Sequence, residues 1–204
     1  MVESRGAALR SPLSLVVLAL LFEAPTHPYR MQKLIQERGQ DRLVNVKSRN
    51  SIQQTVTRLE RDGLIASREP ERPGGYPQRV VYALTEAGRD ALHETLHELL
   101  ARPSDEYPRF PAALAFAAIL SPGTTADLLR DRRERLAATL DAERASARSA
   151  AARLPAILLI ENDYVRAMRE AEIGWLDRTL DALESGRLTW STEELLAQPP
   201  RHES

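Results

Sequence analysis

The sequence predicts a mainly helical fold with one small β-hairpin, divided into two parts. Three observations predict it: three short helical patterns in the first 63 residues, two short strand patterns around a Pro-Gly-Gly turn, and two long helical patterns within residues 125–185. With 204 residues, 43% hydrophobic and 28% charged, the chain has a globular composition and is long enough for two small domains.

Leu13–Phe22 is almost wholly apolar and predicts a buried first helix. The segment is about ten residues long, whereas a helix that spans a bilayer needs about 20. Arg5 and Arg10 precede it, which loosely resembles a signal peptide, but Glu23 stands where a cleavage site needs small residues. The buried helix is therefore the favoured interpretation.

Two more short helices follow a break that contains two prolines. Tyr29–Gly39 predicts the second helix, with Gly39 as its stop. Ser48 is a candidate N-cap for the third helix, which Gly63 ends. The apolar positions at helical spacing in the two helices are Met31, Leu34, Ile35, Ile52, Val56 and Leu59.

A hairpin and a fourth helix complete the first part. Leu64–Arg68 and Gln78–Leu84 read as strands, and Arg72–Pro77 reads as the turn between them. Thr85 caps the fourth helix, which ends in the linker 102–108. Three helices followed by a hairpin predict a winged helix-turn-helix domain, residues 1–102, and leave 103–204 as a second, helical domain.

The second domain is predicted to pair two copies of the chain. Phe110–Leu120 reads as a short helix, and residues 125–153 and 155–185 read as long amphipathic helices with little else to cover them. A second copy is the simplest source of a covering surface, so we expect a homodimer. The candidate dimerisation residues are Leu92, Leu96, Leu99, Val165, Met168, Trp175, Leu176 and Leu180.

The third helix carries a polar face that suits DNA. At 100° per residue, the face opposite Ile52 holds Asn50, Gln54, Thr57, Arg58 and Arg61. Amide and guanidinium groups complement base edges and phosphates. The candidate DNA contacts of this helix are Lys47, Arg49, Asn50, Ser51, Gln53, Gln54, Thr57 and Arg58, and those of the wing are Arg72, Gly74, Gly75, Tyr76, Gln78 and Arg79.

The charge distribution agrees with DNA binding by the first part of the chain and pairing of two copies by the second. Residues 1–92 carry a net charge of +4 and residues 93–204 a net charge of −5, while the whole chain is at −1. We expect the first part to meet DNA and the acidic second part to stay away from it. The chain has no cysteine, which excludes disulfides and thiolate metal sites and is compatible with a cytoplasmic protein.

At this point the chain resembles the PadR family of transcriptional regulators, in particular its longer-tailed branch with a helical C-terminal domain. The specific motifs are Asn50–Leu64, similar to the family's recognition helix, and Gly74–Gly88, similar to its wing and following helix. Leu13–Phe22, His27–Tyr29 and Glu172–Leu176 are similar to its first helix, second helix and tryptophan-bearing dimerisation helix. The resemblance covers nearly the whole chain.

The resemblance implies a homodimeric repressor that binds a palindromic operator and is released by a small-molecule effector, without a cofactor or enzymatic activity. The chain departs from the family at Pro28, where a glycine is usual, and at Ile52–Gln54, where a Leu-Tyr-Pro run is usual. Two amides thus replace an aromatic ring and a proline at the base-reading end. The operator of a relative is therefore not expected to carry over to this chain.

Two alternatives come from other classes of function. His93–His97 matches HExxH, in which two histidines bind zinc and the glutamate is the general base of a protease; no histidine follows at metzincin spacing, although Glu143 could supply a third ligand. A winged helix can also mediate protein contacts alone, but a helix face that binds protein favours exposed apolar side chains.

Three aromatic residues are candidates for an effector pocket. Tyr164, Trp175 and Trp190 could line such a pocket or simply pack in the core or a subunit interface.

Overall fold

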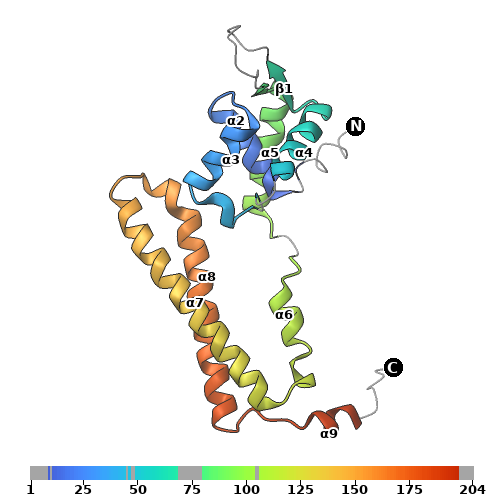
Figure 1. Cartoon of the computed structure of the whole chain (residues 1–204), viewed down its shortest axis with the longest axis vertical. Coiled ribbons are helices and arrows are strands. Elements are labelled where there is room, and N and C mark those ends of the chain that lie inside the picture. The colour runs from blue at the N-terminus through green and yellow to red at the C-terminus, as the bar shows by residue number, and fades with distance from the viewer. Residues whose placement is uncertain are drawn as a thin grey trace. The chain divides into compact units, whose positions relative to one another are not determined.

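The computed structural model describes residues 9, 11–44, 46, 49–68, 80–103 and 106–197. Over these residues the chain is mainly helical with one two-stranded antiparallel sheet, which confirms the predicted fold class (Figure 1). The chain divides into two compact units, Met1–Asp105 and Glu106–Ser204, at a point within the predicted linker. Each unit has a hydrophobic core of its own.

The first unit contains the three short helices at the predicted places. They are α2 (Pro12–Glu23), α3 (Pro28–Glu37) and α4 (Arg49–Arg61), with the 3₁₀ turn η1 (Gln40–Arg42) after α3. Six of the twelve residues of α2 are buried, and the helix packs against α4, α5 and β2, so the predicted first helix belongs to the core of this unit. No described helix is long and apolar enough to cross a membrane.

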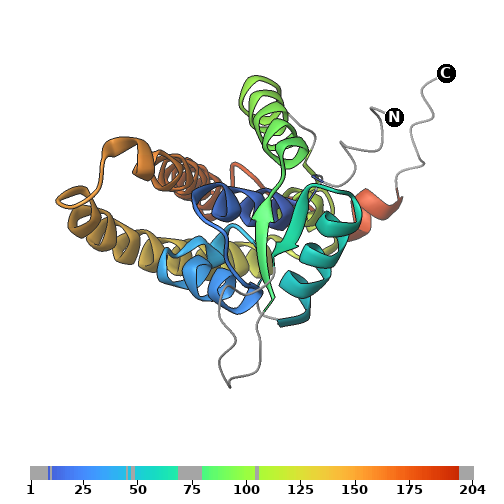
Figure 2. The same ribbon diagram turned by 90° about the horizontal axis from the view of Figure 1, so that it is seen from above.

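The predicted hairpin strands are present as β1 (Ile65–Arg68) and β2 (Val81–Leu84). They pair antiparallel, with Ile65 opposite Leu84 and Arg68 opposite Val81. Figure 2 shows the two strands side by side. The predicted turn Arg72–Pro77 lies outside the described residues.

Helix α5 (Glu86–Ala101) follows the sheet and is capped as expected. The Thr85 side chain accepts a hydrogen bond from the Gly88 amide at 3.0 Å. Because a side-chain oxygen satisfies one of the unpaired amides of the first turn, the cap fixes where α5 begins.

In the second unit, α7 (Pro122–Ala151) and α8 (Ile160–Glu184) lie side by side as an antiparallel hairpin (Figure 1), joined through the 3₁₀ turn η3 (Ala156–Leu159). The two predicted long helices are confirmed. Helix α7 begins earlier than predicted because the Ser121 side chain accepts from the Thr124 amide at 3.2 Å and Pro122 occupies the first position, where its missing N–H costs nothing.

The segment before α7 corrects one expectation. The prediction of a single helix over Phe110–Leu120 was wrong: α6 (Arg109–Leu114) ends early, and the 3₁₀ turn η2 (Ala117–Ile119) follows. Tertiary contacts explain the break. Phe110 and Leu114 pack against the hairpin core. The carbonyls of Ala118 and Leu120 accept hydrogen bonds from the C-terminal segment. A local sequence pattern carries no information about either contact.

That C-terminal segment includes α9 (Thr192–Ala197), which the sequence analysis did not anticipate. The Trp190 indole donates to the Leu120 carbonyl at 2.9 Å, and the Thr192 hydroxyl donates to the Ala118 carbonyl at 2.9 Å. The tryptophan therefore has a structural partner within its own unit, which favours the packing interpretation of this residue.

Candidate nucleic-acid interface

Helix α4 presents the polar face that the sequence predicted. Ile52, Val56 and Leu59 are buried in the core of the first unit. Gln54 and Thr57 are exposed on the side away from that core. The burial pattern confirms the expected division of α4 into an apolar inner face and an amide, hydroxyl and guanidinium outer face.

The end of α4 leads directly into the sheet. Gly63 adopts a left-handed conformation with φ of 74°, and the Leu64 amide donates to the Leu59 carbonyl at 2.9 Å. This Schellman-type end satisfies a carbonyl of the last turn and needs a residue without a β-carbon at the left-handed position. The strand β1 therefore starts in a fixed direction from α4.

Helix α5 is also joined to the place where α4 leads into β1, which we call the corner. The Thr85 hydroxyl lies 2.8 Å from the Gly63 carbonyl and 3.0 Å from the Leu64 carbonyl. A β-carbon placed on Gly88 would lie 1.9 Å from the Leu64 carbonyl oxygen, which is far inside van der Waals contact. Only glycine allows α5 to approach β1 so closely, so the corner is built around Gly88.

Strand β2 contacts α4 through Tyr82. Burial raises the pKa of the Tyr82 phenol, the Glu60 carboxylate raises it further, and a hydrogen bond with the Gln53 side chain lowers it. The Tyr82 backbone pairs with Thr26, donating to its carbonyl at 2.9 Å and accepting from its amide at 3.0 Å. The Gln53 side chain of α4 thus contacts Tyr82 on β2.

Arg58 differs from the expected arrangement. Its Nη2 donates to the hydroxyl of Ser14 on α2 at 2.6 Å, and its Nε is buried without a hydrogen-bond partner among the described residues. The guanidinium therefore turns toward α2 rather than outward with Gln54. Sequence reasoning missed Ser14, although one signal was available: it is the single polar residue within the apolar segment Leu13–Phe22.

The other predicted DNA contacts lie at the start of α4 and in the predicted wing. Asn50 is exposed in the first turn of α4 and takes part in a side-chain interaction, and Ser51 is half-buried there. Arg49 opens α4 by its backbone. Outside the described residues lie Lys47 and the predicted wing contacts Arg72, Gly74, Gly75, Tyr76, Gln78 and Arg79.

The candidate dimerisation residues fall into two groups. Leu92, Leu176 and Leu180 are buried within their own chain, Leu92 in the first core and the other two beneath α7. Their side chains are therefore already covered before any second copy binds. The positions with exposed or half-exposed side chains are Leu96, Leu99, Val165, Met168 and Trp175.

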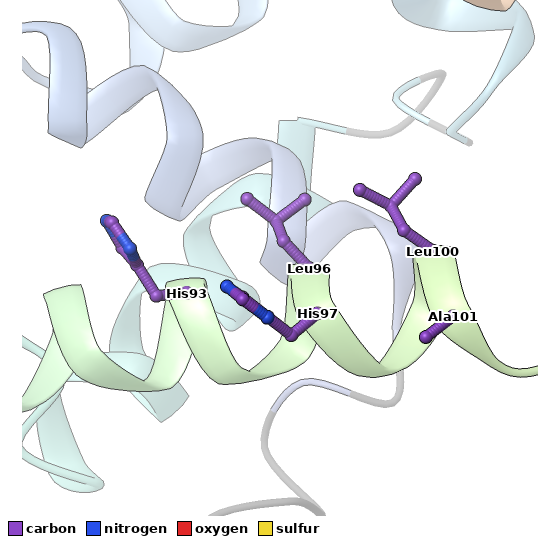
Figure 3. Close-up of a pocket in the computed structure, with 5 residues that line it drawn as sticks. All are labelled: His93, Leu96, His97, Leu100 and Ala101. Atoms are coloured by element: carbon purple, nitrogen blue, oxygen red, sulfur yellow. The ribbon is translucent and has the colours of Figure 1, made fainter.

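The HExxH match lies on the exposed side of α5. His93, His97 and three apolar residues line a shallow pocket of about 430 Å³ (Figure 3). Within the described part of the chain, no group of three or more His, Asp or Glu side chains could hold a metal ion. Glu143, which could have supplied a third ligand, forms an ion pair with Arg169 on α8.

Comparison with known proteins agrees with this geometry. Residues 17–94, from within α2 to within α5, match the family model described as the transcriptional regulator PadR-like family. This part of the chain is similar to PadR-like transcriptional regulators. The matched residues include all of α4 and the corner around Gly63 and Gly88, so the match covers the part of the chain that presents the polar face.

Solved structures of PadR-like regulators share the fold over more than the matched domain. Bacillus subtilis PadR in complex with operator DNA is 20% identical with a TM-score of 0.66, over 84% of this chain and 97% of that one. The same protein with p-coumaric acid is 19% identical with a TM-score of 0.68, over 84% and 98%. The Vibrio cholerae virulence activator AphA is 19% identical with a TM-score of 0.66, over 85% and 99%.

At these identities the likeness shows the fold alone. No curated protein matches the chain. The function of this chain is therefore inferred from its own residues.

Proposed function

We propose that the chain is a homodimeric repressor that binds a palindromic operator through α4 and the wing and is released by a small-molecule effector. The observation that carries the proposal is the outer face of α4. It combines Gln54, Thr57 and Arg61 on a helix whose inner face is buried and whose C-terminal end is fixed to the sheet.

The chemistry of that face suits direct base reading. An amide such as that of Gln54 can pair with adenine through two hydrogen bonds, whereas a guanidinium such as that of Arg61 suits guanine or phosphate. In helix-turn-helix docking the N-terminal turns of the reading helix meet base edges. We therefore assign base reading to Asn50, Ser51 and Gln54, and to Gln53 where its amide has capacity left beside the hydrogen bond to Tyr82.

Backbone contacts are assigned to the basic residues around the reader. Lys47, Arg49, Arg72 and Arg79 flank the helix or belong to the wing in the sequence. Contacts between such residues and phosphates position a protein on DNA without reading its sequence. Binding should consequently weaken steeply as salt rises.

The second unit supports the proposed dimer. Large apolar side chains around the turn between α7 and α8 are exposed, with Ile157 at 68% and Met168 at 54%. A cluster of this kind marks a surface that binds another protein, and a second copy supplies an identical face. We call this cluster the hairpin patch: Leu154, Ile157, Leu158, Ile160, Tyr164 and Met168.

A dimer gives a physical route to regulation. Two reading helices bind successive grooves only in some dimer geometries, so a ligand that prefers another geometry releases the DNA. The Bacillus subtilis relative, whose fold this chain shares, was solved with operator DNA and with p-coumaric acid. By analogy, we propose an effector for this chain, of a chemistry that the fold does not specify.

The proposed DNA binding also bears on where the protein acts and on whether it is an enzyme. A protein that binds an operator has to reach the chromosome, so we infer that it acts in the cytoplasm. We assign it no enzymatic activity and no cofactor. The Vibrio cholerae relative is named as an activator, so a reporter assay with and without the regulator is needed to test repression.

The decisive experiment is a selection of bound fragments from random duplex DNA by the full chain, read by sequencing. The proposal predicts a palindrome whose half-sites are about one helical turn, or a multiple of it, apart. Light scattering on the free protein should give twice the 22.8 kDa chain mass. A protein that enriches no sequence, or a stable monomer at micromolar concentration, contradicts the proposal.

A further inference from the structure

Arg58 lies on the reading helix but turns toward the protein. Its Nη2 is 2.6 Å from the Ser14 hydroxyl, and Ser14 is wholly buried in α2. The Arg58 Nε is also buried and has no hydrogen-bond partner among the described residues. A guanidinium held in this way directs its hydrogen-bonding capacity to the protein, so its Nη2 is not free for a phosphate.

The position of Arg58 on α4 explains the contact. At 100° per residue Arg58 lies at the edge of the outer face, nearer to Gln54 than to Ile52. Helix α2 packs against α4, and the hydrogen bond between Arg58 and Ser14 joins the two helices. A long side chain at the edge of the outer face can therefore turn toward the neighbouring helix.

A contact of this kind constrains rotation of the reading helix. Apolar packing of Ile52 and Leu59 holds α4 against the core but tolerates small shifts, since such contacts have no direction. A hydrogen bond with a charged donor is directional and stronger than one between neutral groups. The bond to Ser14 therefore fixes α4 relative to α2 in a way that burial alone does not.

We propose that Arg58 is a positioning residue: through Ser14 it ties α4 to α2 and so sets the direction in which Gln54 and Thr57 meet DNA. The inference rests on the proposed DNA-binding function. It changes the role of Arg58 from a contact with DNA to a contact that orients the residues that read DNA.

A double-mutant cycle tests the proposal in the full chain. Ser14→Ala, Arg58→Met and the double variant are compared with the wild type by fluorescence anisotropy, on a duplex that the wild type enriches from a random pool. Each single variant should bind about tenfold more weakly, and the double variant should lose about tenfold as well, because all three break the same contact. Met retains the aliphatic stem of Arg58, which keeps its packing.

Salt dependence separates positioning from phosphate binding. Arg58→Met should leave the slope of log K against log salt close to that of the wild type, whereas loss of a phosphate contact lowers it by about 1. Arg61→Ala, which removes an exposed charge from the same helix, shows the size of a direct effect. Ser11→Ala is the matched serine control, since the Ser11 side chain makes no cap hydrogen bond, and it should bind like the wild type.

Three results would overturn the positioning role. The first is that Ser14→Ala binds DNA as tightly as the wild type while Arg58→Met binds more weakly and with a lower slope of log K against log salt, which would make Arg58 a phosphate contact. The second is that both variants bind DNA as tightly as the wild type and differ from it only by a lower melting temperature. The third is a double variant whose loss of binding free energy equals the sum of the losses in the two single variants. If Arg58→Met does not fold, Ser14→Ala alone decides, and a wild type that enriches no sequence overturns the proposed function itself.

Discussion

The two units treat their large apolar side chains differently. In the first unit, α2, α3, α4 and the sheet enclose a continuous core. In the second, α7 and α8 enclose a small core at one part of the hairpin and leave the hairpin patch exposed. The first unit therefore covers most of its large apolar side chains within its described residues, although Leu96, Leu99 and Leu100 on α5 remain exposed. The second unit exposes the larger share, and exposed apolar surface of this kind favours contact with another protein.

Ion pairs join the two long helices of the second unit. They cross from α7 to α8, such as those of Arg130 with Glu184 and of Arg132 with Glu172. Partly exposed pairs of this kind add about 0–1 kcal/mol each and mainly fix register. The Arg132 guanidinium also lies 3.5 Å from the centre of the Phe110 ring, which holds α6 against the hairpin.

The largest effect should come from the hairpin patch. Ile157→Glu combined with Met168→Glu places charges in the proposed interface, so the dimer should dissociate and operator affinity should fall by about 10²–10⁴, the gain that linked half-sites provide. Light scattering and anisotropy measure the two effects. Ala138→Glu, an exposed position of α7 outside the patch, is the control, and equal behaviour of both proteins would refute the patch as an interface.

The next largest effect should fall on the first unit alone. Gly88→Ala forces a methyl group against the Leu64 carbonyl, so the free energy of unfolding should drop by about 3 kcal/mol, the upper range for overpacking. Thermal unfolding followed by circular dichroism should show a separate early transition while the hairpin persists. Gly123→Ala, where a β-carbon meets nothing within 4 Å, should melt no earlier than the wild type.

A smaller effect should separate reading from anchoring. Gln54→Ala removes an exposed amide, so it should leave folding and dimerisation intact and cost about 1–3 kcal/mol on the selected duplex, with little effect on unrelated DNA. Arg79→Ala, assigned to the wing from the sequence, should weaken both duplexes alike. Anisotropy at one salt concentration compares them, and an equal loss on both duplexes for Gln54→Ala contradicts the assignment.

The smallest effect concerns the ion pair between the ends of α2 and α3. Arg38 donates two hydrogen bonds to the Glu23 carboxylate, at 2.6 and 2.7 Å, and these lower the pKa of Glu23 below 4.5 despite partial burial. A lowered pKa in the folded state means that the pair stabilises the fold above pH 4.5 and loses this contribution as the pH falls through the lowered value.

Glu23→Gln should therefore lower stability at pH 7 by at most about 1 kcal/mol, because both side chains are exposed to solvent. Denaturant titrations at pH 7 and pH 3 measure the change, and the difference from the wild type should shrink at the lower pH. Glu98→Gln, at an exposed position of α5, controls for a general effect of charge. A difference in stability that grows toward pH 3 would contradict the expected sign of the effect.

Most of the fold could be predicted from local patterns. The inner face of α4 follows from the spacing of Ile52, Val56 and Leu59, and the ends of α4 and α5 follow from Gly63 and Thr85. Such signals are local, because caps and helical periodicity act within a few residues of the chain. The amphipathic helix α4 could therefore be predicted from the sequence without knowledge of its surroundings.

The rest depends on contacts between distant segments. The bond between Arg58 and Ser14 joins residues 44 positions apart, and the break after α6 depends on contacts with α8 and with the C-terminal segment. Spacing placed Leu92, Leu176 and Leu180 on apolar stripes but could not distinguish a stripe covered by the same chain from one covered by a partner. That distinction needs the tertiary structure.

The central claim is that α4 reads DNA as one of two symmetric copies. The most direct test is to repeat the selection from random DNA with Gln54→Ala and compare the motif with that of the wild type. We expect a palindrome in which base preference is lost at two positions related by the two-fold axis, one in each half-site, and retained elsewhere. A motif unchanged by the substitution, or changed at a single position without symmetry, would contradict it.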